Sequence, residues 1–508
     1  MICVTGSEPT VGALASRICA LPEAPLHEAR LDLVDHVTPE AVSALPERHR
    51  LIVTCRTAAE GGQWRGAEPA RLALLDAALE AGARYVDVEA AAPDETWQAL
   101  HSRHGGERLV ASGHHYEPIG ATPEILAGLQ RRVTGRPAAT LKVAVRIDDV
   151  VDLGGLRRLE PGDDRPLVRI GMGLAGLPGR VRYDVMGSPW TYATAPGTAA
   201  TAPGQVGWDL VQAFARRKAE RLVVLVGGDQ VGGSPGPQVY NALAAAEGLP
   251  WYYLAAPTAD VARALAVLDD FGLRGASVTM PHKAAAAALA AGLDDNAARL
   301  GAANTLVPDG VGGWTGYNTD GAGVIGALGP HLEGPSQVAV LGTGGAARAA
   351  VAELTRVGHQ VLVVGRRPEA AADLARDLGG TPVAWQDLTS LRFDALVNAT
   401  PLGQDGETSP VEVPLEWRGR VVLDMVIQPR WTPLLRSVRA GGGVPVVGLT
   451  MWAHQGAAQW QLITGHGVAP TRLAGLVPPD GDGDGDGDGD GDGDGDGDGD
   501  GDGGDDAP

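Results

Sequence analysis

Lysine is rare in this chain, and its rarity marks positions where an amine could do chemistry. Of the 41 basic residues only Lys142, Lys218 and Lys283 are lysines. A lysine amine can lose its proton and act as a nucleophile or base, whereas arginine stays charged. Lys142 lies inside the apolar run TLKVAV, where burial favours the neutral amine that attacks a carbonyl. Lys283 follows SVTMPH at the start of an alanine-rich helix, and Lys218 in ARRKAE is expected on a solvated helix face.

A second chemical pattern is the glycine-rich turn within residues 337–367, a segment that reads strand, turn, helix, strand. Small residues in such a turn let the backbone approach a pyrophosphate at the helix N-terminus. The strand before the turn and the helix after it favour this interpretation over a purely structural turn. The predicted cofactor contacts are Gly342, Gly344, Gly345 and Ala346, with Ala347 in place of the last fingerprint glycine.

The strand that closes this unit is followed by Arg366 and Arg367 instead of an acidic residue. A carboxylate there would bind the ribose 2′-hydroxyl of NAD, whereas arginine suits the 2′-phosphate of NADP. We therefore predict NADP as the cofactor, with Arg366 as a contact. Two surface arginines in an arginine-rich chain are the competing interpretation, which is stronger for Arg367 than for Arg366.

These residues need elements to position them, and the first 220 residues supply short apolar runs that alternate with helix-length segments. Eight such runs predict a (β/α)8 barrel. They are ICV (2–4), ARLDLV (29–34), LIVTC (51–55), YVDVE (85–89), RLVAS (108–112), TLKVAV (140–145), LVRIG (167–171) and RYDVM (182–186).

Polar side chains stand at the ends of these runs. The C-terminal ends of barrel strands form one mouth, so we expect these side chains to converge there. Each one taken alone is more simply a solvated loop residue, but the repetition over successive strands favours a site. The residues concerned are Glu28, Arg30, Arg56, Glu60, Glu89, His114, Lys142 and Arg180.

The net charge of −21 comes mostly from the C-terminal run of Gly-Asp repeats. Asp480 to Asp506 contains 14 aspartates and no basic residue, which leaves 48 acidic and 41 basic residues elsewhere. Because acidic residues outnumber basic ones even without this run, the net charge excludes a strongly basic surface that would bind nucleic acid. Three cysteines are too few for a disulfide framework or a thiolate metal site, and no apolar run is long enough to span a membrane. We expect a cytoplasmic protein with no metal, nucleic-acid or membrane partner.

The first 220 residues resemble a type I 3-dehydroquinate dehydratase. The motifs occur in order on successive strands: Glu28-Ala-Arg30, Thr54-Cys-Arg56, Glu60-Gly-Gly, Asp87-Val-Glu89, Ser112-Gly-His114, Leu-Lys142-Val-Ala and the closing APGQ that ends at Gln205. The resemblance implies that Lys142 forms a Schiff base with the substrate ketone, while His114 shuttles protons with support from Glu60. It also implies that Arg180 binds the substrate carboxylate, and that the ring hydroxyls and carboxylate are held by Glu28, Arg30, Arg56 and Gln205. Thr201 stands where the family usually has serine, and its hydroxyl is retained.

The proposed chemistry also follows from the residue types. A β-hydroxy ketone loses water easily once its carbonyl becomes an iminium, because the adjacent carbon is then more acidic. A neutral lysine and one histidine are sufficient for this reaction. A class I aldolase uses a lysine in the same way, so the chemistry alone does not separate the two.

Residues 221–476 resemble shikimate dehydrogenase. The motifs are Ser234-Pro-Gly236-Pro, Ser277-Val-Thr279-Met-Pro-His-Lys283, Gly301-Ala-Ala-Asn304-Thr, Tyr317-Asn-Thr-Asp320-Gly, the glycine turn, Asn398-Ala-Thr400-Pro-Leu-Gly403 and Gly448-Leu-Thr-Met-Trp-Ala-His-Gln455. The resemblance implies that Lys283 and Asp320 exchange the hydroxyl proton during hydride transfer. Ser234, Thr279, Asn304 and Gln455 would bind the substrate, and Asn398 and Thr400 would contact the cofactor.

This second half departs from its family around the substrate carboxylate. Gly236 stands in place of the second serine, Ser277 replaces an asparagine, and Ile427 stands where a tyrosine is common. Losing two hydroxyls that bind a charged group would cost a few kcal/mol, on the order of 1.5–3 kcal/mol for each hydrogen bond. Gly236 also leaves room beside ring carbon 1, where quinate carries an extra hydroxyl.

The resemblances together predict a bifunctional enzyme that dehydrates 3-dehydroquinate to 3-dehydroshikimate and reduces this product to shikimate with NADPH. One alternative gives the second half quinate as its substrate, and another makes that half an inactive NADP-binding module. The expected fold class is α/β, in which the barrel precedes a two-domain dehydrogenase unit. The predicted domains are the barrel (1–219), a substrate-binding domain (220–330), a Rossmann NADP-binding domain (331–447), a C-terminal helix returning to the substrate domain (448–478) and a disordered acidic tail (479–508).

Overall fold

The structure is a computed structural model of the 508-residue chain. It describes residues 1–119, 122–202, 204–411 and 416–478. The expected disordered tail, 479–508, lies outside the described residues. Residues Met1–Val477 form one compact unit. In the described part of the chain, no helix combines the length and the apolar character that crossing a membrane requires.

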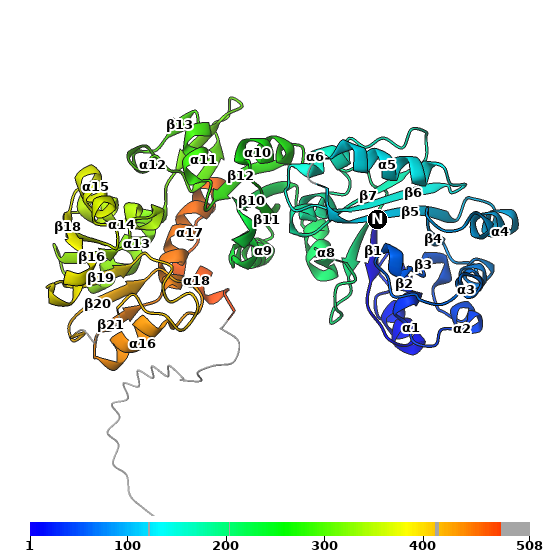
Figure 1. The fold of residues 1–508 in the computed structure, drawn as a ribbon, viewed down its shortest axis with the longest axis horizontal. Coiled ribbons are helices and arrows are strands. Elements are labelled where there is room, and N and C mark those ends of the chain that lie inside the picture. The colour runs from blue at the N-terminus through cyan, green and yellow to red at the C-terminus, as the bar shows by residue number, and fades with distance from the viewer. Residues whose placement is uncertain (120–121, 203, 412–415, 479–508) are drawn as a thin grey trace, which may run out of the picture. The chain divides into compact units, whose positions relative to one another are not determined.

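The N-terminal half is a parallel sheet curled around its own side chains. The strands alternate with helices along the chain, and Figure 1 shows this part in blue to cyan. The strands pair in the order β7-β6-β5-β4-β3-β2-β1-β8-β9. The elements are β1 (Ile2–Thr5), α1 (Val11–Ala20), β2 (Leu26–Arg30), α2 (Pro39–Ser43), β3 (Leu51–Thr54), α3 (Glu68–Glu80), β4 (Tyr85–Glu89), α4 (Asp94–His104), β5 (Leu109–Pro118), α5 (Pro123–Thr134), β6 (Thr140–Arg146), α6 (Asp152–Arg157), β7 (Leu167–Met172), α7 (Leu177–Val181), β8 (Thr191–Thr194), β9 (Val206–Gly207) and α8 (Trp208–Arg216).

The barrel interior is filled by apolar side chains from both ends of this sheet. Cys3 of β1, Ile170 of β7 and Tyr192 of β8 belong to the same buried cluster. Among the described residues, β7 and β8 are nevertheless not paired by backbone hydrogen bonds. The α/β class and the parallel barrel strands predicted from the sequence are confirmed, while the sheet has the form of a barrel that is open between these two strands.

Two of the expected barrel strands differ from the structure. The run 182–186 is a turn, and the eighth strand is β8, which pairs with β1 from Ile2↔Thr191 to Thr5↔Thr194. The run 29–34 is a strand only to Arg30, because a short 3₁₀ helix follows at Leu31–Leu33. The prediction of strand 182–186 was wrong because the backbone of this run bonds to itself: the Met186 N–H donates to the Arg182 carbonyl at 3.2 Å, and the Gly187 N–H donates to the Asp184 carbonyl at 3.0 Å.

The second sheet is mixed and has the order β11-β10-β12-β14-β15-β13. Alternate residues of β10 face opposite sides: Val224 joins a core shared with the barrel, and Val223 joins a core that includes the last long helix. The elements are β10 (Arg221–Gly227), α9 (Gly236–Ala246), β11 (Trp251–Pro257), α10 (Val261–Asp269), β12 (Leu273–Val278), α11 (Lys283–Leu289), β13 (Gly292–Leu293), α12 (Asp295–Leu300), β14 (Thr305–Pro308), β15 (Trp314–Tyr317) and α13 (Asp320–Leu328).

The third sheet is parallel throughout, with the doubly wound order β18-β17-β16-β19-β20-β21. Such a sheet binds its ligand at the strand ends where the order reverses, here between β16 and β19. The elements are β16 (Gln337–Leu341), α14 (Gly345–Arg356), β17 (Gln360–Gly365), α15 (Pro368–Leu378), β18 (Thr381–Ala384), β19 (Ala395–Asn398), β20 (Val421–Asp424), α16 (Pro433–Ala440) and β21 (Val444–Val446).

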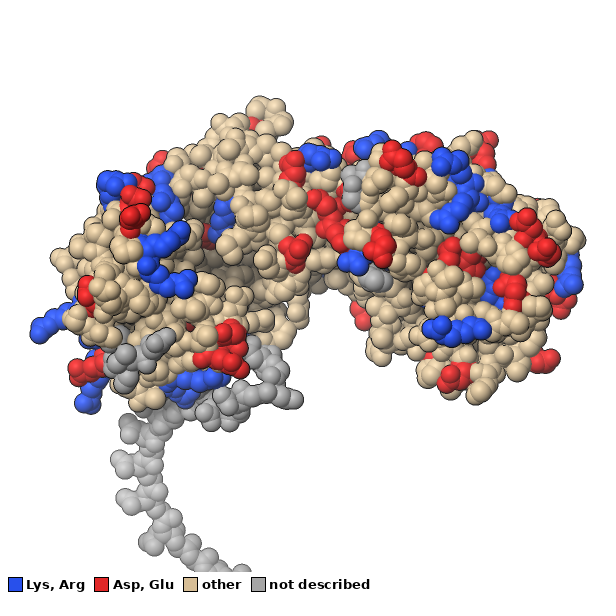
Figure 2. Space-filling view, in the orientation of Figure 1, with Lys and Arg blue, Asp and Glu red and all other residues tan. Residues whose placement is uncertain are grey.

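The chain then returns to the second sheet through α17 (Gly448–Thr464), which is followed by α18 (Pro470–Gly475). Trp452 and Trp460 of α17 pack around Tyr240 of α9, with the Tyr240 and Trp460 rings stacked at a centroid distance of 5.2 Å. This packing places Gln459 of α17 against Ser277 near the end of β12, and Gln455 of α17 against Thr319 at the start of α13. On the face drawn in Figure 2, acidic and basic side chains of the described residues are interspersed.

Candidate active sites

A cavity of about 130 Å³ opens toward the C-terminal ends of the barrel strands. Apolar side chains of β6, β7 and β8 form part of its wall, and charged side chains from other strands and loops reach into it. Six of the eight side chains expected at the barrel mouth line this cavity: Glu28, Arg30, Arg56, His114, Lys142 and Arg180. Thr201 and Gln205, expected from the family resemblance, also line it. Glu60 and Glu89 do not line it, and Glu89 instead accepts hydrogen bonds from Arg71 and from the Thr57 N–H.

Lys142 of β6 is held in the cavity by a carboxylate of β4, which is separated from β6 in the sheet by β5. Its Nζ lies 2.9 Å from Asp87 Oδ2 and 4.5 Å from the centre of the Tyr192 ring. Asp87 also accepts a hydrogen bond from Arg56 at 2.8 Å. Burial alone would raise the pKa of Asp87, but the charges of Arg56 and Lys142 hold that pKa well below its usual range. Asp87 is therefore a carboxylate that two buried cations share.

His114 forms the second polar cluster of the cavity. Its Nδ1 lies 2.8 Å from Glu60 Oε2, and Tyr116 donates a hydrogen bond to the Glu60 backbone carbonyl. Burial, followed by the positive charges of Arg56 and Lys142, holds the pKa of His114 well below its ordinary value of 6.5. Burial also raises the pKa of Glu60. His114 is thus a neutral imidazole near pH 7 and can accept a proton.

The other wall of the cavity combines a buried guanidinium with a polar loop. Arg180 is 2% exposed, and its Nε donates to the Gly171 carbonyl at 2.8 Å. Burial lowers the pKa of Arg180 to about 10, so the group remains cationic at neutral pH. Gln205 accepts a hydrogen bond from the Thr201 backbone N–H at 2.8 Å. On the facing strand, Glu28 accepts from the Thr54 hydroxyl at 2.9 Å.

The second half contains a separate polar cluster at the start of α11 and α13. Lys283 Nζ donates to Asp320 Oδ2 at 2.5 Å, and Asn304 Nδ2 donates to Asp320 Oδ1 at 2.8 Å. The hydroxyl of Thr319 lies 3.3 Å from Gln455 Oε1 on α17. Four predicted site residues, namely Lys283, Asp320, Asn304 and Gln455, are therefore brought together from segments far apart in the sequence.

Ser234 and Thr279 lie in the loops beside this cluster. Ser234 stands before α9, and its hydroxyl accepts a hydrogen bond from the Gly236 N–H at 3.2 Å. Thr279 follows β12, and a Cβ added at Gly227 would lie only 2.5 Å from its methyl group. Gly227 therefore has to be a glycine for the Thr279 loop to approach so closely. In the described part of the chain, neither residue forms a side-chain hydrogen bond with Lys283, which donates to Asp320.

The glycine turn of the third sheet fits a dinucleotide. Gly342 has φ +114, and its N–H donates to the Val364 carbonyl at 2.9 Å, which places the turn between β16 and β17. A side chain added at Gly344 or Gly345 would meet open space, so the N-terminus of α14 is accessible to a ligand. Ala346 lies in the first turn of α14.

The other predicted cofactor residues stand at the ends of adjacent strands. Asn398 ends β19, where it donates to Asp424 at 2.9 Å and accepts from the Thr400 hydroxyl at 2.7 Å. Arg366 directly follows β17 and is exposed. An exposed guanidinium at this strand end suits the 2′-phosphate of NADP, just as the glycine turn suits the pyrophosphate.

The sequence motifs assigned no role to three residues that contact the two sites: Asp87, Tyr192 and Gln459. Asp87 had a signal, since a carboxylate in the middle of the apolar strand YVDVE is rarely buried without a partner. Gln459 receives a hydrogen bond from Ser277 at 2.8 Å and donates to the Asn304 carbonyl at 2.9 Å. Its position 182 residues from Ser277 left no local sequence signal.

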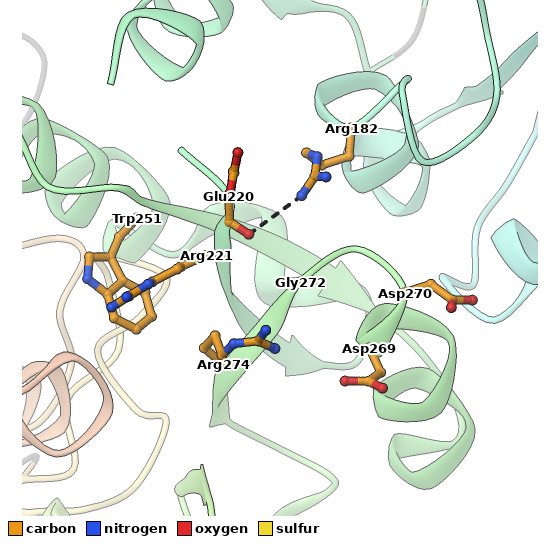
Figure 3. Close-up of a pocket in the computed structure, with 8 residues that line it drawn as sticks. All are labelled: Arg182, Glu220, Arg221, Trp251, Asp269, Asp270, Gly272 and Arg274. Carbon is orange, nitrogen blue, oxygen red and sulfur yellow. Dashed lines mark hydrogen bonds between the residues drawn. The ribbon is translucent and has the colours of Figure 1, made fainter. Parts of the chain in front are cut away.

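A larger cavity of about 630 Å³ lies where the barrel meets the second sheet. Figure 3 shows Arg182 directed toward the Glu220 carbonyl in this cavity, with Arg274 and Asp269 nearby. None of the predicted site residues lines it. Lys218, the third lysine, is exposed as expected, but it lies just after α8, which ends at Arg216, and not on a helix face.

Three family models match successive parts of the chain. They are described as type I 3-dehydroquinase over residues 2–216, shikimate dehydrogenase substrate binding domain over 226–306, and NADP oxidoreductase coenzyme F420-dependent over 337–426. The matches divide the sequence where the barrel, the second sheet and the third sheet divide the structure.

Individual relatives agree with these matches. A bifunctional 3-dehydroquinate dehydratase/shikimate dehydrogenase of Arabidopsis thaliana, described as chloroplastic, is 29% identical over 87% of this chain and 78% of its own length. A shikimate dehydrogenase (NADP(+)) of Acidiphilium cryptum is 39% identical over 47% of this chain and 89% of its own length. A dehydroquinate dehydratase and shikimate dehydrogenase structure from S. pombe is 23% identical with a TM-score of 0.44, covering 94% of this chain and 98% of that one.

Proposed function

The chain belongs to the shikimate dehydrogenase family, and a type I 3-dehydroquinase domain precedes the dehydrogenase part; we propose that the two parts catalyse one reaction each. It is a bifunctional enzyme of the shikimate pathway. The barrel converts 3-dehydroquinate to 3-dehydroshikimate, and the second half reduces 3-dehydroshikimate to shikimate with NADPH.

The observation that carries the dehydratase assignment is the convergence of an amine, an imidazole and a guanidinium on one cavity. His114 takes a proton from the Lys142 ammonium, the resulting amine adds to the substrate ketone, and His114 returns the proton as water leaves to give a protonated imine. His114 removes the proton from the adjacent carbon and then protonates the departing hydroxyl, so one water is lost overall. Arg180 binds the substrate carboxylate, for which a planar guanidinium is suited. Hydrolysis of the imine releases the product and restores Lys142.

Borohydride reduction in the presence of 3-dehydroquinate tests this assignment. Reduction of the imine should fix a substrate-sized mass on the peptide that contains Lys142, with loss of dehydratase activity. Lys142→Arg, which keeps the charge but cannot form an imine, is the matched variant. An adduct that persists in Lys142→Arg or appears on Lys218 would overturn the imine mechanism.

The dehydrogenase assignment is supported by the contact between Lys283 and Asp320 beside Asn304 and Gln455. NADP, when bound at the glycine turn, supplies the hydride donor or acceptor. Lys283 gives a proton to the carbonyl oxygen as 3-dehydroshikimate is reduced and regains it through Asp320. Asn304 and Gln455 orient the ring hydroxyls. Gly344, Gly345 and Ala346 would approach the pyrophosphate, Arg366 would bind the 2′-phosphate, and Asn398 and Thr400 would contact the cofactor from the end of β19.

Quinate is a second candidate substrate for this half, because Gly236 leaves space near Ser234. A Cβ at position 236 would meet the Ser234 hydroxyl oxygen and Tyr253 Cε1 at 3.4 Å each. Reduction of NADP with shikimate and with quinate, in wild type and in Gly236→Ser, separates the substrates. A higher kcat/KM for quinate would replace the shikimate assignment.

Product analysis from 3-dehydroquinate with NADPH reports both halves together, and shikimate is the expected product. The alternative of an inactive NADP-binding module predicts accumulation of 3-dehydroshikimate and no effect of Lys283→Ala. The domain bounds given from the sequence and a cytoplasmic location are also part of the proposal. The location is supported by Cys3, Cys19 and Cys55, which are all free thiols.

A further inference from the structure

A chain of hydrogen bonds leads from the barrel to the lysine of the dehydrogenase site. It begins at Asp149, in the loop between β6 and α6. β6 is the strand that carries Lys142, but Asp149 points toward the second sheet instead of the barrel cavity. Neither its side chain nor its neighbours line that cavity.

The Asp149 carboxylate accepts three hydrogen bonds where the barrel meets the second sheet. Its Oδ1 accepts from the Thr258 hydroxyl at 2.8 Å and from the Val151 N–H at 2.9 Å. Its Oδ2 accepts from the Ala259 N–H at 2.8 Å. The backbone is also joined here, since the Val150 N–H donates to the Pro257 carbonyl at 3.0 Å. The carboxylate thus fixes the residues that follow β11.

Thr258, which Asp149 holds in place, is in turn hydrogen-bonded to the buried His282. The Thr258 carbonyl lies 2.7 Å from His282 Nε2. Because a carbonyl oxygen only accepts, the histidine nitrogen is the donor in this contact. Thr258 is 6% exposed and His282 is 7% exposed, so water does not readily replace either partner.

His282 in turn fixes the start of α11. It is the N-cap residue of this helix, its N–H donates to the Thr279 carbonyl at 2.9 Å, and its carbonyl accepts from Ala286 at 2.8 Å. Lys283 is the next residue and the first of α11, with Nζ in contact with Asp320. A shift of the His282 ring would therefore move the backbone that carries Lys283.

We propose that Asp149 of the barrel is a positioning residue for the dehydrogenase site, acting through Thr258 and His282 on Lys283. The proposal rests on the function proposed above, in which Lys283 exchanges the hydroxyl proton. It makes part of the catalytic competence of the second half depend on a carboxylate of the first half. The dehydratase site is not affected by this route, because Asp149 faces away from its cavity.

Asp149→Ala in the full chain tests the proposal. Its kcat for NADP-dependent shikimate oxidation should fall about ten-fold, since a displacement of 1 Å at a catalytic group costs on the order of a hundred-fold and this one is smaller. The KM for NADP and the dehydratase kcat should stay unchanged in the same preparation. Asp149→Asn keeps the Oδ1 acceptor for Thr258 and Val151 but replaces the Oδ2 acceptor of the Ala259 N–H by an amide donor, so it should recover only part of the lost kcat. Thr258→Val removes the hydroxyl that Asp149 binds and should resemble Asp149→Ala.

Asp148→Ala is the matched control, because Asp148 is the exposed neighbour whose carboxylate contacts Arg146 at 3.0 Å. Hydrogen exchange of the peptide containing residues 279–289 gives a readout that needs no turnover, and it should be faster in Asp149→Ala than in Asp148→Ala. Equal exchange and equal kcat in these two variants would overturn the proposal, as would a parallel loss of both activities. If wild type oxidises neither shikimate nor quinate, the proposed function fails, and the exchange difference alone then decides whether Asp149 positions α11.

Discussion

Asp87 balances the positive charges of the barrel cavity, because it contacts Lys142 and Arg56 at the same time. Removing one partner from a buried ion pair leaves an uncompensated charge, which costs about 3–5 kcal/mol. The neutral amide of Asp87→Asn keeps the shape of the side chain but not its charge. Lys142 and Arg56 would then repel each other and leave the geometry that the substrate needs.

We therefore expect Asp87→Asn to lower the dehydratase kcat/KM about a hundred-fold, which corresponds to roughly 2.7 kcal/mol of transition-state stabilisation. The measurement is the initial rate of 3-dehydroshikimate formation at several substrate concentrations. Shikimate oxidation by the same protein serves as the internal control and should not change. A dehydratase kcat/KM equal to wild type would show that Asp87 has no part in the reaction.

His114 leads to a prediction about pH. Burial and the charges of Arg56 and Lys142 hold its pKa below 6.5, so the imidazole stays neutral as the pH falls through that value. The acid limb of the dehydratase kcat/KM profile should consequently lie well below pH 6.5, because that limb reports the base of the free enzyme. Glu60→Gln keeps the hydrogen bond to His114 and is the comparison variant. An acid limb at pH 6.5 or above would contradict this account of His114.

At the scale of elements, the dehydrogenase site depends on a close contact between α13 and α17. A Cβ at Gly323 would lie 2.7 Å from the Met451 carbonyl oxygen and 2.9 Å from Gln455 Cβ. α13 begins at Asp320, and α17 carries Gln455. The absence of a side chain at Gly323 therefore sets the distance between a proposed catalytic residue and a proposed substrate ligand.

Gly323→Val should push the two helices apart and destabilise the protein by about 1–3 kcal/mol, as overpacking of a buried contact does. Shikimate oxidation should fall with it, while dehydratase activity is retained. Gly329→Ala at the end of the same helix is the matched control, because a Cβ there meets nothing within 4 Å. Thermal unfolding and both activities measure the effect, and equal behaviour of the two variants would refute it.

The elements also show which features a sequence can predict. Lys142 and His114 were located because their motifs occur on successive strands, and parallel barrel strands bring their C-terminal ends together. The eighth strand was misplaced because it is defined by its pairing with β1, about 190 residues earlier in the chain. The local sequence gives no such information, and the alternation of apolar and polar residues in RYDVM is as typical of a strand as the sequence of β8. The contact between Asp149 and Thr258 spans 109 residues and has no local pattern, so only the folded chain reveals it.

For the whole molecule, the distribution of cores indicates which parts unfold together. One buried cluster contains Val143 of the barrel and Leu268 of α10, so the barrel and the second sheet share a core. The residues that pack the third sheet belong to two other clusters, one of which includes Leu354 of α14. A cavity in the shared core should thus weaken both of the first two parts.

Leu268→Ala should cost about 2–5 kcal/mol, the usual range for a buried leucine. Hydrogen exchange in urea should show the loss in peptides from β6 as well as from β12. Leu354→Ala, which is also fully buried, should affect the peptides of the third sheet instead. If Leu268→Ala leaves the β6 peptides at the wild-type midpoint, the barrel and the second sheet unfold independently.

The exposed position of Lys218 has a practical consequence. The other two lysine side chains are engaged with Asp87 and Asp320, with 8% and 23% of their surface exposed. Among the lysines, an amine-reactive linker would therefore attach mainly through Lys218, alongside the exposed N-terminal amine of Met1. Lys218 does not line the barrel cavity, and it is not one of the residues proposed for the dehydrogenase site. A linker at Lys218 would therefore leave both reaction centres open to solution.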